Sequence, residues 1–120
     1  MELNFTLNSL YICVKNMDRA IDFYQRLLDI DAETKDQILS IFNISGFRFC
    51  LFNNGKVNEM KSWGNNCLPS FKVNDINKLL ERLKELNSEL VFPLTRINDN
   101  WVLEFEDSEG NHIEAYSKIV

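Results

Sequence analysis

The chain has 120 residues, a length that suits one compact domain and leaves no room for two independent hydrophobic cores. Apolar residues make up 45% of it and charged residues 26%, which is typical of a folded globular protein and excludes disordered and low-complexity classes. Its 13 basic and 18 acidic residues give a net charge of −5, so we expect no nucleic-acid partner, because such binding requires a basic face.

Cysteine content and hydropathy further restrict the class of protein to which the chain can belong. Cys13, Cys50 and Cys67 are an odd number without C-x-x-C spacing, so we expect neither a zinc ribbon nor a disulfide framework. Each cysteine lies beside apolar residues, which favours a buried thiol over a reactive one. No apolar run approaches the roughly 18 residues of a membrane span, and the N-terminus lacks the basic flank and apolar core of a signal peptide. These features predict a cytoplasmic protein without a membrane partner.

In chain order, the first predicted elements are a strand at 9–14 and an amphipathic helix at 16–30. Asn16 is the expected N-cap of this helix. Its apolar residues recur at three- and four-residue spacing and form one stripe: Met17, Ala20, Ile21, Tyr24, Leu27 and Leu28. Two strands follow at 38–44 and 47–52, joined by a short turn.

A polar segment at 53–66 separates this half from a second half with the same order of elements. The second half opens with a strand at 70–73 and a helix at 75–87, for which Asp75 is the expected cap. Its remaining strands are predicted at 90–94, 101–107 and 112–116.

The two halves also align residue by residue. Four apolar and capping residues of the first half fall on four of the second at one constant offset: Val14, Asn16, Met17 and Ile21 on Val73, Asp75, Ile76 and Leu80. At a slightly larger offset, 46–52 falls on 110–116. We interpret residues 1–120 as one domain with pseudo-repeats at about 7–53 and 67–118. Each repeat is a βαβββ unit too small to bury its sheet face alone.

Two stretches of the chain carry a family resemblance. The first is Val14-x-Asn16-Met17-x-x-Ala20-Ile21-x-Phe23-Tyr24-x-x-Leu27-Leu28, and the second is Asp107-Ser108-Glu109-Gly110-Asn111-His112-Ile113-Glu114. They resemble the opening helix and the closing hairpin of the vicinal oxygen chelate superfamily, the group of glyoxalases, bleomycin-resistance proteins and extradiol dioxygenases. The chain is most similar to the metal-free, bleomycin-resistance-like branch.

The resemblance implies an α+β fold of two tandem βαβββ units, whose curved mixed sheets form a cup. Helices would cover the convex side, faced by Leu10, Ile12, Val14, Ile113 and Ala115, and ligands would lie on the concave side. Strand alternation then assigns the ligand-binding candidates on the concave side: Tyr11, Arg48, Cys50, Phe52, His112, Glu114 and Tyr116. Trp101 is expected as a further wall of this pocket, and Trp63 as a cover over its mouth. Each aromatic residue has an alternative place in the hydrophobic core.

The resemblance places the metal-ligand positions of the family at Ser9, Cys50, Leu68 and Glu114. Only Glu114 carries a suitable oxygen ligand, whereas catalytic metal sites ordinarily supply about three protein ligands. A zinc site of Cys50, His112 and Glu114 is the alternative, and it is disfavoured by the apolar setting of Cys50. We therefore expect no metal and no other cofactor.

Glu114 has three possible roles. It is a candidate catalytic base only if it is desolvated and if Arg48 or Lys72 stabilises a developing enolate. It would otherwise form a salt bridge with Arg48 across the cup, or anchor a ligand. The anchor role is the simpler interpretation.

The expected function is metal-independent binding of a small molecule in the concave pocket, which the bleomycin-resistance branch implies. We expect a homodimer, because open cups leave exposed sheet edges. The sign of the ligand's charge stays open, because a pI of 4.8 suits a cation whereas Arg48 and Lys72 suit an anion. The alternatives are a glyoxalase-type lyase or isomerase with a divergent metal site, and a protein-interaction module without a ligand. Whether the chain is an enzyme is therefore undecided, with binding favoured over catalysis.

Overall fold

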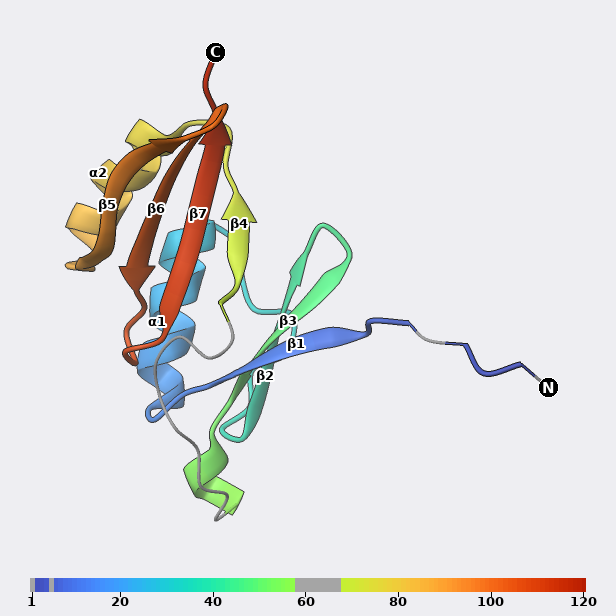
Figure 1. Ribbon diagram of the computed structural model, residues 1–120. Coiled ribbons are helices and arrows are strands. Elements are labelled where there is room, and N and C mark those ends of the chain that lie inside the picture. Colours follow the sequence, from blue (N-terminus) through green and yellow to red (C-terminus); the bar gives the residue numbers. More distant parts are fainter. Residues whose placement is uncertain (1, 5, 58–67) are drawn as a thin grey trace.

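The computed structural model describes residues 2–4, 6–57 and 68–120 (Figure 1). Its elements are, in chain order, β1 (Ser9–Cys13), α1 (Met17–Leu28), β2 (Leu39–Ile44), β3 (Phe47–Phe52), the 3-10 helix η1 (Asn54–Val57), β4 (Ser70–Lys72), α2 (Ile76–Glu85), β5 (Leu90–Ile97), β6 (Asn100–Glu106) and β7 (His112–Lys118). This order confirms the predicted α+β fold of tandem βαβββ units. In the first unit, the remaining strand is reduced to an isolated bridge between Thr34 and Ile41.

The strands form two mixed sheets with the orders β1-β3-β2 and β4-β7-β6-β5. In each sheet the first strand of the unit pairs in parallel with its last strand. Ser9 of β1 lies opposite Arg48 of β3, and Ser70 of β4 lies opposite Glu114 of β7. The other pairs are antiparallel. The two halves therefore share one pattern of strand pairing.

Both helices begin at the predicted caps. The side chain of Asn16 accepts a hydrogen bond from the Arg19 backbone N–H, and that of Asp75 accepts from the N–H groups of Asn77 and Lys78. These bonds satisfy donors that the first turn of a helix leaves free. α1 ends two residues earlier than predicted, because Asp29 adopts the left-handed conformation at φ 54°.

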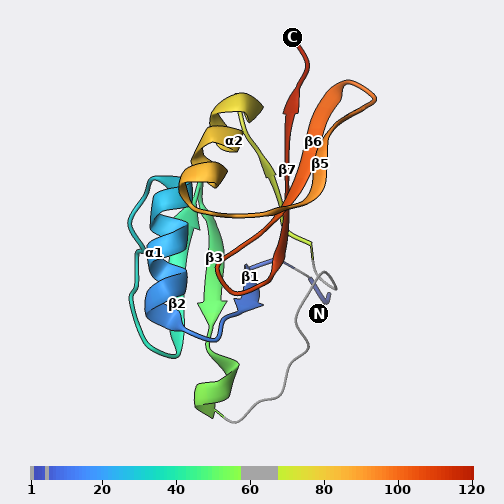
Figure 2. The same cartoon turned by 90° about the vertical axis from the view of Figure 1, so that its left-hand side faces the viewer.

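One hydrophobic core joins both sheets and both helices. α1 contributes its predicted stripe, and each sheet contributes the face that is turned toward the helices. The fully or nearly buried members from the strands are Phe42, Phe49, Leu51, Leu103, Phe105, Ile113 and Ala115. Both helices lie on the same side of the molecule in Figure 2. The predicted orientation of Ile12, Val14, Ile113 and Ala115 toward the helices is confirmed, and Leu10 packs against the same core.

β5 runs to Ile97, three residues beyond its predicted end. It is the outer strand of its sheet, and its pairing with β6 shifts register on either side of Phe92. An outer strand with a bulge tolerates Pro93, because its missing N–H need not enter the ladder of hydrogen bonds. Four apolar residues of β5 remain exposed: Leu90, Val91, Phe92 and Ile97.

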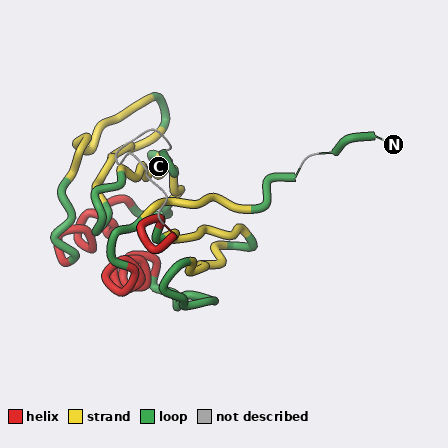
Figure 3. Tube along the Cα trace, turned by 90° about the horizontal axis from the view of Figure 1, so that it is seen from below, coloured by secondary structure: helices red, strands yellow, loops and turns green. Residues whose placement is uncertain are grey.

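The N-terminal arm, residues 2–4 and 6–8, runs away from the body of the molecule (Figure 3). Leu3 and Leu7 are 81% and 82% exposed. Among the described residues, neither helix has the length and apolar character needed to cross a bilayer.

Candidate functional site

The first candidate surface lies on β6 and β7, on the side turned away from the helices. Register pairs Glu104 with Glu114 and Glu106 with His112, so these four side chains share one face. The opposite face of the same strands carries core residues such as Leu103 and Ile113. We call Glu104, Glu106, His112 and Glu114 the acidic face; each of the four residues is partly buried.

His112 lies between two carboxylates of the acidic face. Its Nδ1 is 3.7 Å from Glu104 Oε2, and its Nε2 is 3.7 Å from Glu106 Oε1. These are ion-pair distances, too long for hydrogen bonds, and the buried Nδ1 has no hydrogen-bond partner. Glu104 and Glu114 are directly opposed like charges, an unfavourable arrangement in a sheet. The acidic face thus places Glu104 and Glu106 beside the His112 ring and Glu114 directly opposite Glu104, and an added cation would reduce the repulsion between the paired carboxylates.

The second candidate surface lies on β1 and β3 of the other sheet. Register pairs Tyr11 with Cys50, while Arg48 and Phe52 lie two positions away on the same face. The Tyr11 side chain is 52% exposed, and its ring centroid lies 6.1 Å from that of Phe52. We call Tyr11, Arg48, Cys50 and Phe52 the aromatic face.

Cys50 is buried in this surface. Burial raises the pKa of its thiol, and the nearby Arg48 guanidinium opposes the rise only in part. The group is therefore a neutral thiol at neutral pH, which makes it a poor nucleophile and a poor metal ligand.

The structure divides the predicted ligand-binding residues between the two sheets. Tyr11, Arg48, Cys50 and Phe52 lie on one sheet, and His112, Glu114 and Tyr116 lie on the other. Within the described part of the chain, no strand pairing joins the two sheets. The salt bridge that we considered between Arg48 and Glu114 is absent from the ion pairs of the described residues.

Trp101 takes the alternative place that the sequence left open, in the hydrophobic core, and not the place of a pocket wall. It lies on the same side of β6 as Leu103 and Phe105, and it packs against the hydrophobic core. It is therefore on the opposite side of the strand from Glu104. Trp63 and Cys67 lie outside the described residues.

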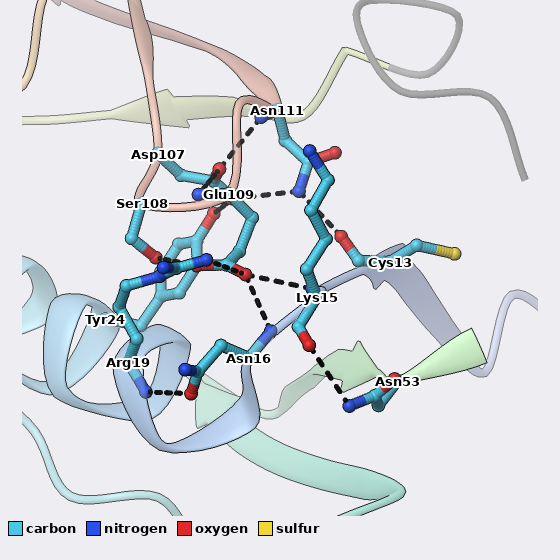
Figure 4. A network of polar contacts seen from close by, with 10 residues as sticks. All are labelled: Cys13, Lys15, Asn16, Arg19, Tyr24, Asn53, Asp107, Ser108, Glu109 and Asn111. Carbon is cyan, nitrogen blue, oxygen red and sulfur yellow. Dashed lines mark hydrogen bonds and ion pairs between the residues drawn. The ribbon is translucent and has the colours of Figure 1, made fainter. Parts of the chain in front are cut away.

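The closing motif, residues 107–111, connects the last hairpin to the start of α1 (Figure 4). Asp107 accepts a 2.6 Å hydrogen bond from the Tyr24 hydroxyl and 2.8 Å bonds from the backbone N–H groups of Glu109 and Asn111. Asn111 in turn donates its side-chain N–H to the Cys13 carbonyl at 2.8 Å. We call residues 107–111 the clasp, because they join the two halves through buried polar groups.

Glu109 is the most connected residue of the clasp. Its Oε1 accepts hydrogen bonds from the backbone N–H groups of Lys15 and Asn16, at 2.9 and 2.8 Å. The Arg19 guanidinium forms a bidentate ion pair with both oxygens of the carboxylate. Burial alone would raise the pKa of Glu109, but the hydrogen bonds from Arg19, Asn16, Ser108 and Lys15 together lower it below its ordinary value. Burial beside Asp107 raises the pKa of Tyr24 well above its usual range. The clasp therefore links the last hairpin to the first half of the chain through hydrogen bonds and one ion pair.

A sequence model of the Glyoxalase/Bleomycin resistance protein/Dioxygenase superfamily matches residues 6–115. The chain belongs to this superfamily.

Solved structures agree with this membership at the level of the fold. The chain is similar to protein ATC0852 from Agrobacterium tumefaciens, with a TM-score of 0.83, 16% identity, and 97% and 100% of the two chains covered. It is similar to a lactoylglutathione lyase from the same organism, with a TM-score of 0.74, 15% identity, and 97% and 96% covered. A genomically encoded fosfomycin resistance protein from Listeria monocytogenes aligns with a TM-score of 0.72, 18% identity, and 98% and 97% covered.

The residues at the superfamily's metal-ligand positions do not fit a metal ion. Ser9 and Cys50 lie on one sheet and Glu114 on the other, while Leu68, just before β4, carries no donor atom. Across residues 2–4, 6–57 and 68–120, no three His, Cys, Asp or Glu side chains are grouped so that they could hold a metal ion. No chemical step is therefore derived through a metal.

Glu104 and Glu106 are not among the residues that we predicted from the sequence. Both lie on β6, two residues apart, in the apolar run Trp-Val-Leu-Glu-Phe-Glu. Two carboxylates at strand spacing in an otherwise apolar strand indicate one charged face, and this signal was available.

Proposed function

We propose that the chain binds a small organic cation on the acidic face, without a metal ion. The observation that carries the proposal is the set of three partly buried carboxylates that share one sheet face with His112, a face that the chain's own core does not use. Partial burial strengthens the attraction of such carboxylates for a cation, because they are less screened by water and salt.

Apolar groups on the same face would surround the ligand. Register places Val102 and Tyr116 beside the Glu104–Glu114 pair, and Phe92 of β5 lies opposite Glu104. A few polar groups among apolar walls are typical of small-molecule sites. This combination favours an amine that carries an aromatic or aliphatic body over a compact inorganic ion.

In this proposal Glu114 is the anchor for the cationic group of the ligand. Of the two groups that we considered as support for a catalytic base, Arg48 belongs to the other sheet, and Lys72 lies opposite Tyr116 instead of Glu114. Binding alone is therefore the function that the arrangement supports best.

A thermal-shift screen of organic amines, with matched carboxylic acids of the same carbon skeleton, tests this function. We expect amines but not acids to raise the melting temperature, because a ligand stabilises the state that binds it. Glu114→Ala should lose the shift, whereas Glu81→Ala on the exposed side of α2 should keep it. A shift with acids only, or one that survives in Glu114→Ala, would show that the cation proposal is wrong.

We also propose that the chain forms a homodimer through its exposed apolar edge. Support comes from the four exposed apolar residues of β5, on an outer strand with free backbone groups. Natural proteins ordinarily cover such edges, since they otherwise pair with other chains. A second copy would cover this edge and bury its apolar side chains.

A further inference from the structure

The side of the sheet that carries the acidic face also carries lysines. β7 pairs with β6 without a register shift, so every second side chain of β7 lies on this side: His112, Glu114, Tyr116 and Lys118. The residues of β7 between them are buried on the opposite side. β4 lies beside β7 (Figure 1), and its register sets Lys72 opposite Tyr116, on the same side as the acidic face. We call Lys72 and Lys118 the basic end of this surface.

The charges on this surface are separated along the strands. The Glu104–Glu114 pair forms one row across the sheet, and the next row away from the clasp consists of Lys72, Tyr116 and Val102. Lys118 lies one row further on, opposite Asn100. The surface therefore changes from negative to positive along β7, with Tyr116 and Val102 in the row next to the carboxylates.

The basic end is not used by the chain's own ion pairs. Both lysines are exposed, and across residues 2–4, 6–57 and 68–120 neither forms an ion pair with a carboxylate. They remain able to pair with an anionic group of a ligand. A surface that is negative at one end and positive at the other is complementary to a ligand with two opposite charges, and it accepts that ligand in one orientation.

We propose that the organic cation bound at the acidic face also carries a carboxylate, so that the ligand is an amino acid whose two charges are separated by an aliphatic chain. This inference rests on the proposed function, because the ammonium group lies at the paired carboxylates of the acidic face. The carboxylate of the ligand lies at the basic end, and its chain crosses Tyr116 and Val102. Lys72 and Lys118 are therefore the residues that determine specificity for a zwitterion over a simple amine.

The spacing of the strands sets the separation of the two charges in the ligand. Lys72 and Glu114 are diagonal neighbours on paired strands, and residues in such positions lie about 7–8 Å apart. Extended 6-aminohexanoate spans a comparable length between its ammonium and carboxylate groups. In an α-amino acid the two charged groups are too close together to reach both ends of the surface.

Calorimetric titration with 6-aminohexanoate and with its neutral amide, 6-aminohexanamide, tests this inference. The two compounds share the ammonium group and the chain, and they differ in the charge at the far end. We expect the carboxylate compound to bind about fivefold more tightly than the amide, a modest gain because ion pairs with exposed lysines are weak. Norleucine, an isomer of 6-aminohexanoate with its two charges close together, should show no such gain over the amide.

The outcomes separate this inference from the proposed function. If neither 6-aminohexanoate nor its amide binds, the cation site itself is wrong. An amide that binds as tightly as 6-aminohexanoate would contradict the zwitterion alone. Norleucine that binds as tightly as 6-aminohexanoate would contradict the separation of the two charges.

Charge removal at the basic end tests whether the gain comes from the lysines. Both side chains are exposed, so Lys72→Gln/Lys118→Gln should fold, which circular dichroism checks. In this variant 6-aminohexanoate should bind no better than the amide, while the affinity for the amide should not fall. The matched control Lys78→Gln/Lys84→Gln makes the same charge change on the exposed side of α2 and should keep the preference. A preference that survives in Lys72→Gln/Lys118→Gln, or that is lost equally in both variants, would overturn the assignment.

Discussion

Glu109 is the residue whose surroundings explain most about how the two halves hold together. Its side chain is completely buried in the ion pair with Arg19, and it accepts two backbone N–H groups at the start of α1. These N–H groups belong to the end of the helix that favours negative charge. The Glu109 carboxylate therefore accepts hydrogen bonds from free N–H groups at the start of α1, and these bonds hold the β6–β7 hairpin against the helix.

Replacement of Glu109 should show how much the clasp contributes to stability. We expect Glu109→Ala to lower the free energy of unfolding by about 2 kcal/mol, because it leaves buried hydrogen-bond donors without partners. Arg19→Ala should cost about 0.5 kcal/mol, since its side chain is 53% exposed and water screens the pair. Urea unfolding measures both variants. A cost for Arg19→Ala equal to that of Glu109→Ala would contradict the dominance of the backbone contacts.

Acid should weaken the clasp. Because the pKa of Glu109 is lowered in the folded state, its contribution is complete above the unfolded value of about 4.3 and is lost as the pH falls through the folded value. The difference in unfolding free energy between the wild type and Glu109→Gln should be constant near neutral pH and shrink below about pH 4. Urea midpoints from pH 3 to pH 7 test this. A difference that persists to pH 3 would contradict the assignment.

Among the secondary-structure elements, the turns of the β2–β3 and β6–β7 hairpins depend on glycine. Gly46 and Gly110 have φ values of 89° and 88°, in the region that residues with a Cβ atom rarely adopt. A Cβ added at either position would meet nothing within 4 Å, so the cost of a substitution is backbone strain alone. We expect Gly46→Ala and Gly110→Ala each to lower the free energy of unfolding by about 1–2 kcal/mol. A much larger cost at Gly110 would mean that the clasp itself is displaced.

The helices and their caps could be predicted from the sequence because their causes are local. Asn16 and Asp75 bond to N–H groups two or three residues away, and the apolar stripe of α1 needs only the period of the helix. The role of Glu109 could not be predicted in this way, because its partners lie 90 or more residues earlier in the chain. Such contacts depend on how the two halves pack.

The orientation of β6 could not be predicted from the alternation of apolar and polar residues along the strand. Val102 and Leu103 are adjacent and both buried, so the apolar pattern does not distinguish the two faces of the strand. The sequence therefore left two places open for Trp101, a pocket wall and the hydrophobic core. The register with β7 resolves the ambiguity, because it sets Val102 opposite Tyr116 and Glu104 opposite Glu114.

At the scale of the whole molecule, the separation of the aromatic face from the acidic face bears on assembly. Each face lies on its own sheet, and each sheet turns its other side to the shared core. A ligand that contacts both faces would therefore have to extend across the boundary between the two sheets. In the proposed homodimer a second copy would cover the exposed β5 edge.

Light scattering coupled to gel filtration tests the dimer. We expect a mass of twice 14.1 kDa for the wild type. Val91→Lys places a charge on the exposed edge of β5 and should shift the protein toward the monomer, because charged edge residues oppose strand pairing. Lys84→Glu, which changes an exposed residue of α2, is the control and should stay dimeric. A monomeric wild type, or a Val91→Lys variant that remains fully dimeric, would contradict this interface.

The most direct test of the central proposal is calorimetric titration of the best amine from the screen, with and without a metal chelator. Metal-independent binding on the acidic face predicts the same affinity in both conditions, and at least a tenfold loss in Glu104→Gln/Glu114→Gln. If the chelator abolishes binding, or if the double variant binds the amine as tightly as the wild type, the acidic face is not a metal-independent cation site.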